Sequence, residues 1–308
     1  MGEDSLRRIA VVGYGEVGGI FGQDLAAAGL SICVYDRLFA VEESRKRMIQ
    51  RARAANVQTC DALSETIEGA ELVISAVTAS EAVRVAGEAS TILRPGQFYM
   101  DMNSVSPDTK AKVAQEIGRS GANFVEAAAM AAVKPYRLKI PMLLGGANAR
   151  QLANKLKALG MDVTPVSERI GVASATKMCR SVVMKGLAAL VIESLFAARR
   201  YGAEDVVIAS FEETYPSMGW TKGLPDALTK RAVQHSKRRA AEMREVCETL
   251  KSSGMSPYMA SSTAALQDWL TKEMEARQFT LNPEEPFSWQ AIADMIAGQA
   301  EPAALTPS

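Results

Sequence analysis

The sequence predicts an α/β fold in which a doubly wound parallel sheet is followed by an all-α C-terminal domain. From residue 8 to about 168, short apolar runs alternate with amphipathic stretches of helical period, as in β-α-β units with helices on both faces of a sheet. After Gly171 the alternation stops, and about 30 residues of helical period follow without a proline until Gly202. We therefore expect two domains, residues 1–168 and residues 169–308.

The apolar runs predict the strands. They are RIAVV (8–12), SICVYD (31–36), ELVISAV (71–77), QFYMDMN (97–103), NFVEAAA (123–129), PMLLGG (141–146) and DVTPVSE (162–168). The run at 71–77 is apolar at nearly every position, which is typical of a strand covered on both faces, so it should be central. Beyond the long helix, turn-forming residues separate four further predicted helices, at 203–215, 224–251, 256–275 and 287–299.

Composition excludes several classes of protein. The 308 residues include 35 basic and 35 acidic side chains, so no net charge attracts nucleic acid or an anionic membrane. No apolar stretch approaches the roughly 20 residues that span a bilayer, and the N-terminus lacks the apolar core of a signal peptide. The four cysteines form no CxxC, and the single histidine completes no metal spacing with them. We expect a cytoplasmic protein with reduced thiols, no metal, and neither nucleic acid nor membrane as a partner.

A glycine motif follows the first predicted strand. In VVGYGEVGG, Gly13, Gly15 and Gly18 have the spacing G-x-G-x-x-G. Gly13 permits a tight turn, Gly15 lets the backbone approach a pyrophosphate, and Gly18 lets the next helix pack close to the strand. A second strand then ends in Asp36, 23 residues after Gly13. Strand, helix and acid together indicate the dinucleotide site of a Rossmann domain, with a turn that binds nothing as the alternative.

Asp36 favours NAD as the cofactor. Its carboxylate would accept hydrogen bonds from the ribose hydroxyls and repel a 2′-phosphate. The adjacent Arg37 could pair with such a phosphate, which keeps NADP as the alternative. The other predicted cofactor contacts lie in the glycine loop and at the ends of two strands: Tyr14, Glu16, Val17, Val77, Thr78 and Asn103.

Three motifs resemble those of the β-hydroxyacid dehydrogenase superfamily, which includes 6-phosphogluconate and 3-hydroxyisobutyrate dehydrogenases. They are GYGEVG (13–18), DMNSVSP (101–107), similar to D-x-x-S-x-x-P, and GVASATKMCRS (171–181), similar to G-x-x-x-x-x-K-x-x-x-N. In addition, residues 235–260 are similar to an uncharacterised helical C-terminal domain on one branch of that superfamily. Together these resemblances cover roughly three quarters of the chain.

The resemblance implies hydride transfer between a nicotinamide and the hydroxyl-bearing carbon of a hydroxy acid. Lys177 would be the general base in oxidation and the general acid in reduction. The small and apolar residues around it would disfavour the charged amine and leave a proton acceptor, whereas a lysine that reaches to the surface is the alternative. Ser104 aligns with the family serine that holds the acid group of the substrate. Ser106, just before Pro107, is expected to cap a helix instead.

Two departures from the family pattern concern the substrate pocket. Ser181 lies one helical turn beyond Lys177, where the family usually has asparagine. Where the family has a double glycine, the chain has Met130 followed by small apolar residues, which favours a substrate with an apolar or aromatic portion. Arg180 is a further predicted substrate contact. In KRAVQHSKRRAAEMRE (230–245), His235 or Arg239 could reach the active site, against a solvated helical face or salt bridges between subunits. A carboxylate clamp in KPYRLK is a further hypothesis, against a solvated loop, through Lys134, Arg137 or Lys139.

Other functions and the oligomeric state complete the expectations. Imine reductases share this architecture but generally lack a lysine at the position of Lys177. A dinucleotide-binding sensor without turnover is a third hypothesis, because the family asparagine and glycines are missing. The long helix, through GLAALVIESLFAA, is apolar enough to need more cover than one small domain supplies, which predicts a homodimer with the active site near the join.

Overall fold

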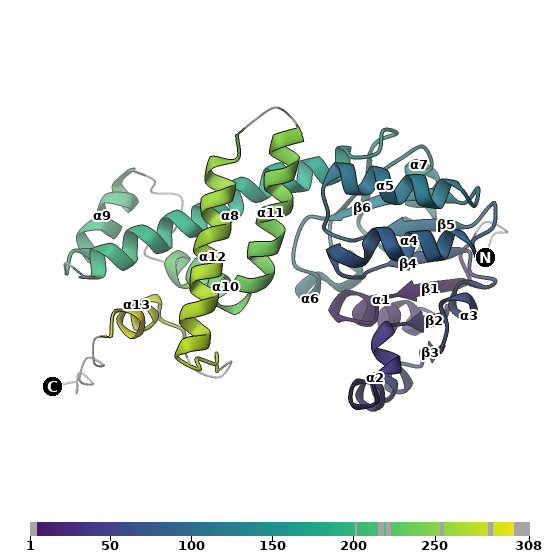
Figure 1. Ribbon diagram of the computed structural model, residues 1–308, viewed down its shortest axis with the longest axis horizontal. Helices are drawn as coiled ribbons and strands as arrows, with labels where there is room; N and C mark the ends of the chain where they lie inside the picture. Colours follow the sequence, from purple (N-terminus) through teal and green to yellow (C-terminus); the bar gives the residue numbers. More distant parts are fainter. Residues whose placement is uncertain are drawn as a thin grey trace. The chain divides into compact units, whose positions relative to one another are not determined.

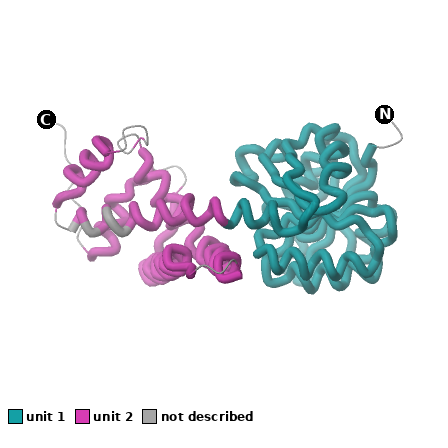
Figure 2. The backbone as a smooth tube through the Cα atoms, turned by 90° about the horizontal axis from the view of Figure 1, so that it is seen from above, with its two compact units in different colours: residues 1–178 teal, residues 179–308 magenta. Residues whose placement is uncertain are grey.

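The computed structural model describes residues 5–200, 202–214, 219, 223–252, 256–282 and 286–298. Contacts within the chain define two compact units, residues 1–178 and residues 179–308 (Figure 2). The division falls inside helix α8, Val172–Arg200, whose first two turns belong to the first unit. The domain boundary expected at residue 168 remains a prediction.

The first unit is built on an eight-stranded sheet of order β3-β2-β1-β4-β5-β6-β7-β8 (Figure 1). Its strands are β1 Arg8–Val12, β2 Ser31–Tyr35, β3 Gln58–Thr59, β4 Leu72–Ser75, β5 Phe98–Asp101, β6 Asn123–Ala129, β7 Met142–Gly145 and β8 Val163–Ser167. The predicted runs all form strands, and β4 lies in the middle of the order, as expected for a strand buried along its whole length. Strand β3 was not predicted, because two residues are too short to show a period.

One strand differs from the expectation of a fully parallel sheet. β7 runs antiparallel to β6, while every other neighbouring pair is parallel. Between β6 and β7 stand only the short α6, Val133–Tyr136, and η3, Arg137–Lys139. These short segments supply no helix long enough to carry the chain back across the sheet for a parallel crossover, and the chain turns back instead.

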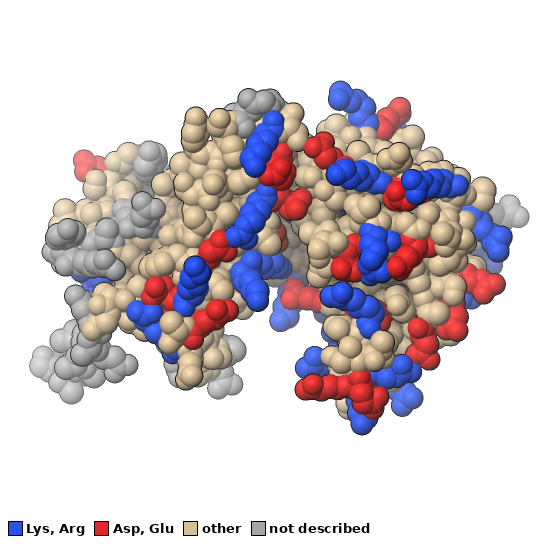
Figure 3. Space-filling model, in the orientation of Figure 1, with Lys and Arg blue, Asp and Glu red and all other residues tan. Residues whose placement is uncertain are grey.

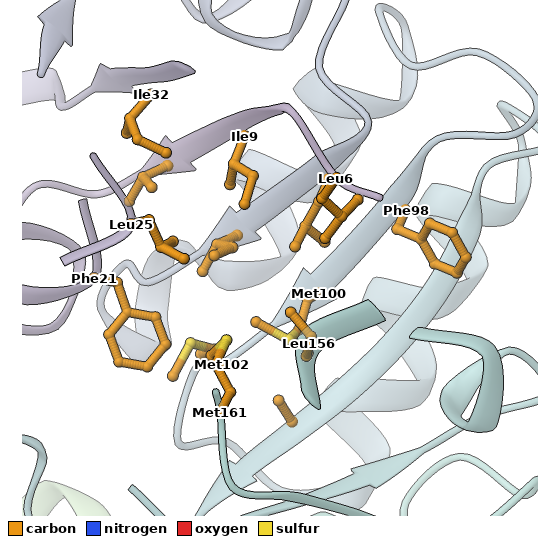
Figure 4. Packing of buried hydrophobic residues seen from close by; sticks show 14 of the residues in the cluster. Leu6, Ile9, Phe21, Leu25, Ile32, Phe98, Met100, Met102, Leu156 and Met161 are labelled. Carbon is orange, nitrogen blue, oxygen red and sulfur yellow. The ribbon is translucent and has the colours of Figure 1, made fainter. Parts of the chain in front are cut away.

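Helices cover both faces of this sheet, which confirms the doubly wound architecture. They are α1 Glu16–Ala27, η1 Arg37–Ala40, α2 Glu42–Ala54, α3 Leu63–Ile67, η2 Ala79–Glu81, α4 Ala82–Ser90, α5 Pro107–Gly118 and α7 Ala149–Ala158. Successive residues of β1 enter two different cores. Ile9 and Val11 pack with residues of α1, α2 and α7, whereas Ala10 and Val12 pack with residues of α3, α4 and α5. Figure 4 shows Ile9 in the first of these cores, with Phe21 and Leu25 of α1. On the face shown in Figure 3, acidic and basic side chains of this unit are interspersed.

In the second unit, every element in the described part is a helix. The continuation of α8 is joined by α9 Glu204–Thr214, α10 Leu224–Gln234, α11 Ser236–Ser252, α12 Tyr258–Ala276 and α13 Trp289–Ala297. A third core packs residues of α8 such as Leu195 against Leu270 and Trp289. The single helix predicted over 224–251 is wrong, since the chain breaks at His235, where φ is −130° and ψ is 21°. No helix within the described ranges is long and apolar enough to span a membrane.

Candidate active site

A pocket of about 320 Å³ opens at the carboxyl ends of β1, β2 and β4. It is the position at which doubly wound sheets bind ligands. Its lining includes many of the predicted cofactor contacts: Gly13, Gly15, Glu16, Val17, Asp36, Arg37, Val77 and Thr78. Tyr14, Gly18 and Asn103 are not among its lining residues.

The three glycines of the loop differ in the space that a Cβ would have at each position. Gly13 has φ +93°, and a Cβ there would lie 2.4 Å from the carbonyl oxygen of Ala76. A Cβ at Gly18 would lie 1.9 Å from the carbonyl oxygen of Gly13. A Cβ at Gly15 would meet no atom within 4 Å. Packing therefore explains Gly13 and Gly18, whereas open space beside Gly15 is what a ligand approaching the loop needs.

Asp36 organises the loop from the end of β2. Its Oδ2 accepts a hydrogen bond of 2.7 Å from the N–H of Tyr14, and its Oδ1 accepts one of 2.9 Å from the N–H of Leu38. The Tyr14 side chain is 1% exposed and has the Arg51 guanidinium 4.2 Å from its ring centroid. Burial raises the pKa of the Tyr14 phenol, which Arg51 partly offsets. Tyr14 thus contributes its backbone to the placement of Asp36 and its side chain to the core.

The arginines of the pocket share one acidic partner. Arg37 lies 3.6 Å from Glu81, and Arg84 makes ion pairs with both Glu81 and Glu88. The hydrogen bond from Arg84 is the main reason that the pKa of Glu81 is lowered. Both guanidinium groups are therefore balanced by carboxylates of the pocket wall.

Asn103 joins the carboxyl ends of two strands. Its Oδ1 accepts a hydrogen bond of 2.8 Å from the N–H of Val77, and its Nδ2 donates one of 3.1 Å to Ser75 Oγ. The side chain is buried at 4% exposure. Its contact with a nicotinamide remains a prediction, but its bonds place the residues after β4 and β5 side by side.

A buried ion pair between the end of β5 and α5 was not predicted. Lys110 Nζ lies 3.1 Å from Asp101 Oδ2 and donates a hydrogen bond of 2.7 Å to the Asp101 carbonyl oxygen. The two side chains are 1% and 0% exposed. In the sequence Lys110 is one of several polar residues in an amphipathic helix, and only the fold shows that it points inward.

The central feature of the site is the contact between Lys177 and Ser104. Lys177 Nζ donates a hydrogen bond to Ser104 Oγ, and both residues are half-buried. Ser106 caps α5 by accepting a hydrogen bond of 3.2 Å from the N–H of Thr109, with Pro107 in the first turn, as predicted. The cap fixes the loop in which Ser104 stands, so two residues 73 apart in the chain meet beside the end of β5.

Glu126 holds the helix that carries Lys177. This strand residue is 0% exposed. Its Oε1 accepts hydrogen bonds from the N–H groups of Gly171, at 2.7 Å, and Ala173, at 3.2 Å, and its Oε2 accepts one from Ser174, at 3.3 Å. A Cβ at Gly145 would lie 2.4 Å from Oε1, so glycine leaves room for the carboxylate. The first turn of α8 is thereby fixed one turn before Lys177.

Sequence analysis missed Glu126, although one signal was available. NFVEAAA is apolar on both sides of a single acid. A lone carboxylate in a buried strand requires donors, and the N–H groups of a helix start are the donors that need an acceptor. Which helix would supply them could not be inferred from spacing.

In the loop after β6, Arg137 has a partner within the fold, and a carboxylate clamp through Lys134 or Lys139 remains a prediction. Met130 is half-buried, and its N–H donates a hydrogen bond of 2.8 Å to the carbonyl oxygen of Pro141. Arg137 is bound to Asp24 of α1, with Nε 2.9 Å from Oδ2, and this hydrogen bond raises the pKa of Arg137. That arginine therefore holds the loop against α1.

The remaining predicted substrate residues belong to the second unit. Ser181 is half-buried and lies four positions beyond Lys177 on α8, while Arg180 is exposed. His235 stands between α10 and α11. Their part in substrate binding remains a prediction. Across the described residues, no group of three or more His, Cys, Asp or Glu side chains is arranged to hold a metal ion.

Two family descriptions match the chain. Residues 8–166 match the NAD binding domain of 6-phosphogluconate dehydrogenase. Residues 198–270 match a domain of unknown function, DUF1932. The first match covers the sheet and the pocket described above.

Individual proteins are similar over most of the chain. An uncharacterized 28.5 kDa protein of Methanothermus fervidus is 30% identical over 83% of this chain and 96% of its own. A conserved hypothetical protein of Sinorhizobium meliloti has a solved structure with 32% identity and a TM-score of 0.76, over 95% of this chain and 96% of that one. The 3-hydroxyisobutyrate dehydrogenase of Mycobacterium tuberculosis, solved with L-serine, has 15% identity and a TM-score of 0.71, covering 94% and 99%. An imine reductase of Pseudomonas shares the fold at 14% identity, with a TM-score of 0.56 over 95% and 100%.

Proposed function

The chain belongs to the family that carries the NAD-binding domain of 6-phosphogluconate dehydrogenase, and from this premise we propose that it is an NAD-dependent hydroxyacid dehydrogenase. Hydride would pass between C4 of the nicotinamide and the hydroxyl-bearing carbon of an organic acid. The observation that carries the proposal is the hydrogen bond between Lys177 Nζ and Ser104 Oγ beside the nucleotide pocket.

Lys177 moves the proton in this proposal. As the hydride leaves the substrate carbon, the uncharged amine accepts the hydroxyl proton, and a carbonyl group remains. In the reverse direction the ammonium group returns that proton to the carbonyl oxygen.

Ser104 binds the acid group of the substrate. Its oxygen accepts the hydrogen bond from Lys177, which leaves the hydroxyl proton free to be donated to a substrate oxygen. Ser104 thereby sets the distance between the substrate and Lys177. NAD, when bound, would supply the hydride acceptor at C4, and the glycine loop and Asp36 would hold it.

The charges of the pocket support NAD over NADP. A 2′-phosphate would meet the Asp36 carboxylate at the end of β2. Arg37, which could neutralise that phosphate, lies 3.6 Å from Glu81. Binding of NADP would require Arg37 to exchange this partner for the phosphate.

Met130 and the small residues after it support a substrate with an apolar or aromatic portion. Ala131 and Ala132 follow in the loop where relatives of this architecture have glycines. Side chains there hold the backbone back from a substrate carboxylate and add apolar surface.

A cytoplasmic homodimer completes the proposal. Within the second unit, α8 exposes Val183 by 67% and Leu190 by 52%, and α9 exposes Val206 by 73%. Such apolar surface is typical of a face covered by another chain, and a second copy is the proposed cover. The cysteines are free thiols, as in a reducing compartment.

The test is the rate of NADH and NADPH formation across aliphatic and aromatic hydroxy acids. Lys177→Met is expected to lower kcat by about 10²-fold to 10⁴-fold while cofactor affinity is unchanged. Lys112→Met, on an exposed position of α5, is the control and should retain full activity. Ser104→Ala should raise KM for the acid more than it lowers kcat.

Three results would overturn the proposal. Equal turnover by Lys177→Met and the native chain would remove the proton-transfer role. Consumption of cyclic imines that is insensitive to Lys177→Met would assign the chain to C=N reduction. Tight cofactor binding without turnover of any alcohol or imine would indicate a sensor.

A further inference from the structure

The second unit contains a cluster of cations on α8, α10 and α11. Lys185 of α8 and Arg238 and Arg239 of α11 lie around Glu242, and Arg231 of α10 is close enough to Arg239 to repel its charge; we call these five residues the Arg239 cluster. Lys185 makes an ion pair with Glu242, and Arg238 Nε lies 3.8 Å from the same carboxylate. Lys185 and Arg238 therefore share the Glu242 carboxylate, which also attracts Arg239.

Arg239 is the half-buried cation of the cluster whose charge no carboxylate of the described residues pairs directly. Its side chain is half-buried, and its Nε is enclosed without a hydrogen-bond partner in the described part of the chain. Burial lowers the pKa of Arg239, and Arg231 and Arg238 lower it further, whereas Glu242 raises it. Glu242 is already engaged by Lys185 and thus offsets only part of the charge.

The same imbalance extends to Lys185. Burial is the main reason that the pKa of Lys185 is lowered, and Arg239 and Arg238 add to the effect. The Lys185 side chain is 15% exposed and that of Glu242 is 26% exposed, so water screens this ion pair weakly, whereas Arg231 and Arg238 are exposed. Like charges held together in such a place are destabilising unless an anion joins them.

A guanidinium group is suited to such an anion. Its planar N–H donors match the two oxygens of a carboxylate or a phosphate, which is why arginine is common at oxyanion sites. Chloride would offset the charge but could not satisfy two parallel donors at once. An oxyanion would give Arg239 Nε the acceptor that it lacks.

We propose that the Arg239 cluster is an oxyanion-binding site of the second unit, with Arg239 as the principal donor and a carboxylate or phosphate group as the ligand. The site does not depend on the function proposed above, because its evidence lies wholly within α8, α10 and α11. A small organic acid and a phosphorylated compound present the same chemistry to it.

The test is the thermal unfolding of the full chain during titration with malonate or with inorganic phosphate, each against sodium chloride at matched ionic strength. The native chain should show a saturable rise in unfolding temperature of roughly 5 °C. The anion that saturates at the lower concentration identifies the group preferred. Phosphate that binds the glycine loop raises the unfolding temperature of every variant equally. The difference in this rise between variants therefore reports on the Arg239 cluster.

Arg239→Gln and Arg244→Gln form the matched pair. Arg244 lies on the same helix but is 56% exposed and makes an ion pair with Asp268. Without added oxyanion, Arg239→Gln should unfold at or above the native temperature, because it removes an uncompensated charge, and its response to oxyanion should vanish. Arg244→Gln should keep the full response. Arg239→Lys, which keeps the charge without the paired donors, should raise the half-saturating concentration about tenfold.

The proposal is overturned if the native chain responds to malonate and phosphate no more than to chloride. A response of native size in Arg239→Gln would also overturn it. So would a fall in the unfolding temperature of both Arg239→Gln and Arg239→Lys without oxyanion, since Arg239 would then be a structural residue.

Discussion

Replacing Glu126 by glutamine is expected to destabilise the first unit by about 3 kcal/mol. The carboxylate accepts hydrogen bonds from Gly171, Ala173 and Ser174 at 0% exposure. Hydrogen bonds to a buried charged group contribute about 1.5–3 kcal/mol each, and neutral ones about 0.5–1.5 kcal/mol. The glutamine carbonyl oxygen can retain two of the bonds in neutral form, but its amide group would face the third N–H with donors.

The same change should also affect catalysis, because the released turn lies directly before Lys177. We expect kcat to fall roughly 10-fold to 100-fold with the dissociation constant of NADH unchanged. Urea unfolding followed by circular dichroism measures the stability, and NADH formation measures the activity.

Glu42→Gln is the control, since Glu42 also lies in the first turn of a helix but its side chain is 75% exposed. Its removal should cost no more than about 1 kcal/mol. Losses of stability that are equal in the two variants would refute the idea that burial makes the Glu126 carboxylate the anchor of α8. A destabilised Glu126→Gln with native kcat would refute its role in placing Lys177.

Lys110→Met should destabilise the chain by about 3–5 kcal/mol, because it leaves the Asp101 carboxylate buried without its cation. Urea unfolding should show that adding Asp101→Asn restores part of this loss. A double variant as unstable as Lys110→Met would count against the ion pair. Asp36→Asn, which keeps an acceptor for Leu38, should shift the ratio of NADPH to NADH affinity by about tenfold toward NADPH, or 1.4 kcal/mol; fluorescence titration measures it, and an unchanged ratio would show that Asp36 does not discriminate. Burial raises the pKa of the Cys60 thiol to about 11. Between about pH 9 and pH 11 the unfolded thiol loses its proton while the native thiol keeps it, so the free energy of unfolding should fall over this range. In Cys60→Ala this fall should be smaller by about 2 kcal/mol. Identical pH profiles of the two proteins would contradict this.

Features encoded over short stretches could be predicted from the sequence. The strand runs, the glycine loop with Asp36 and the cap at Ser106 each depend on residues close together in the chain, so period and spacing suffice. Lys177 and Ser104 were predicted through resemblance to a family.

Features that depend on distant partners could not be predicted in this way. Nothing in the spacing around Lys110 or Glu126 identifies Asp101 or the start of α8 as the partner, because the fold alone brings them together. The reversal of β7 depends on the length of a connection that reads as a plausible crossover. The break at His235 has neither proline nor glycine to mark it.

The continuity of α8 limits how this chain can be divided or recombined. The helix starts on the Glu126 carboxylate, presents Lys177 in its second turn and then supplies Val191 and Leu195 to the core of the second unit. A fragment cut at residue 178 would keep seven residues of α8, and a helix that short frays in water without tertiary support. Lys177, the residue proposed to transfer the proton, would then lie near a frayed helix end. A chimaera that exchanges the second half must therefore be joined inside α8 and must keep the register of that helix. The two halves are thus not interchangeable modules.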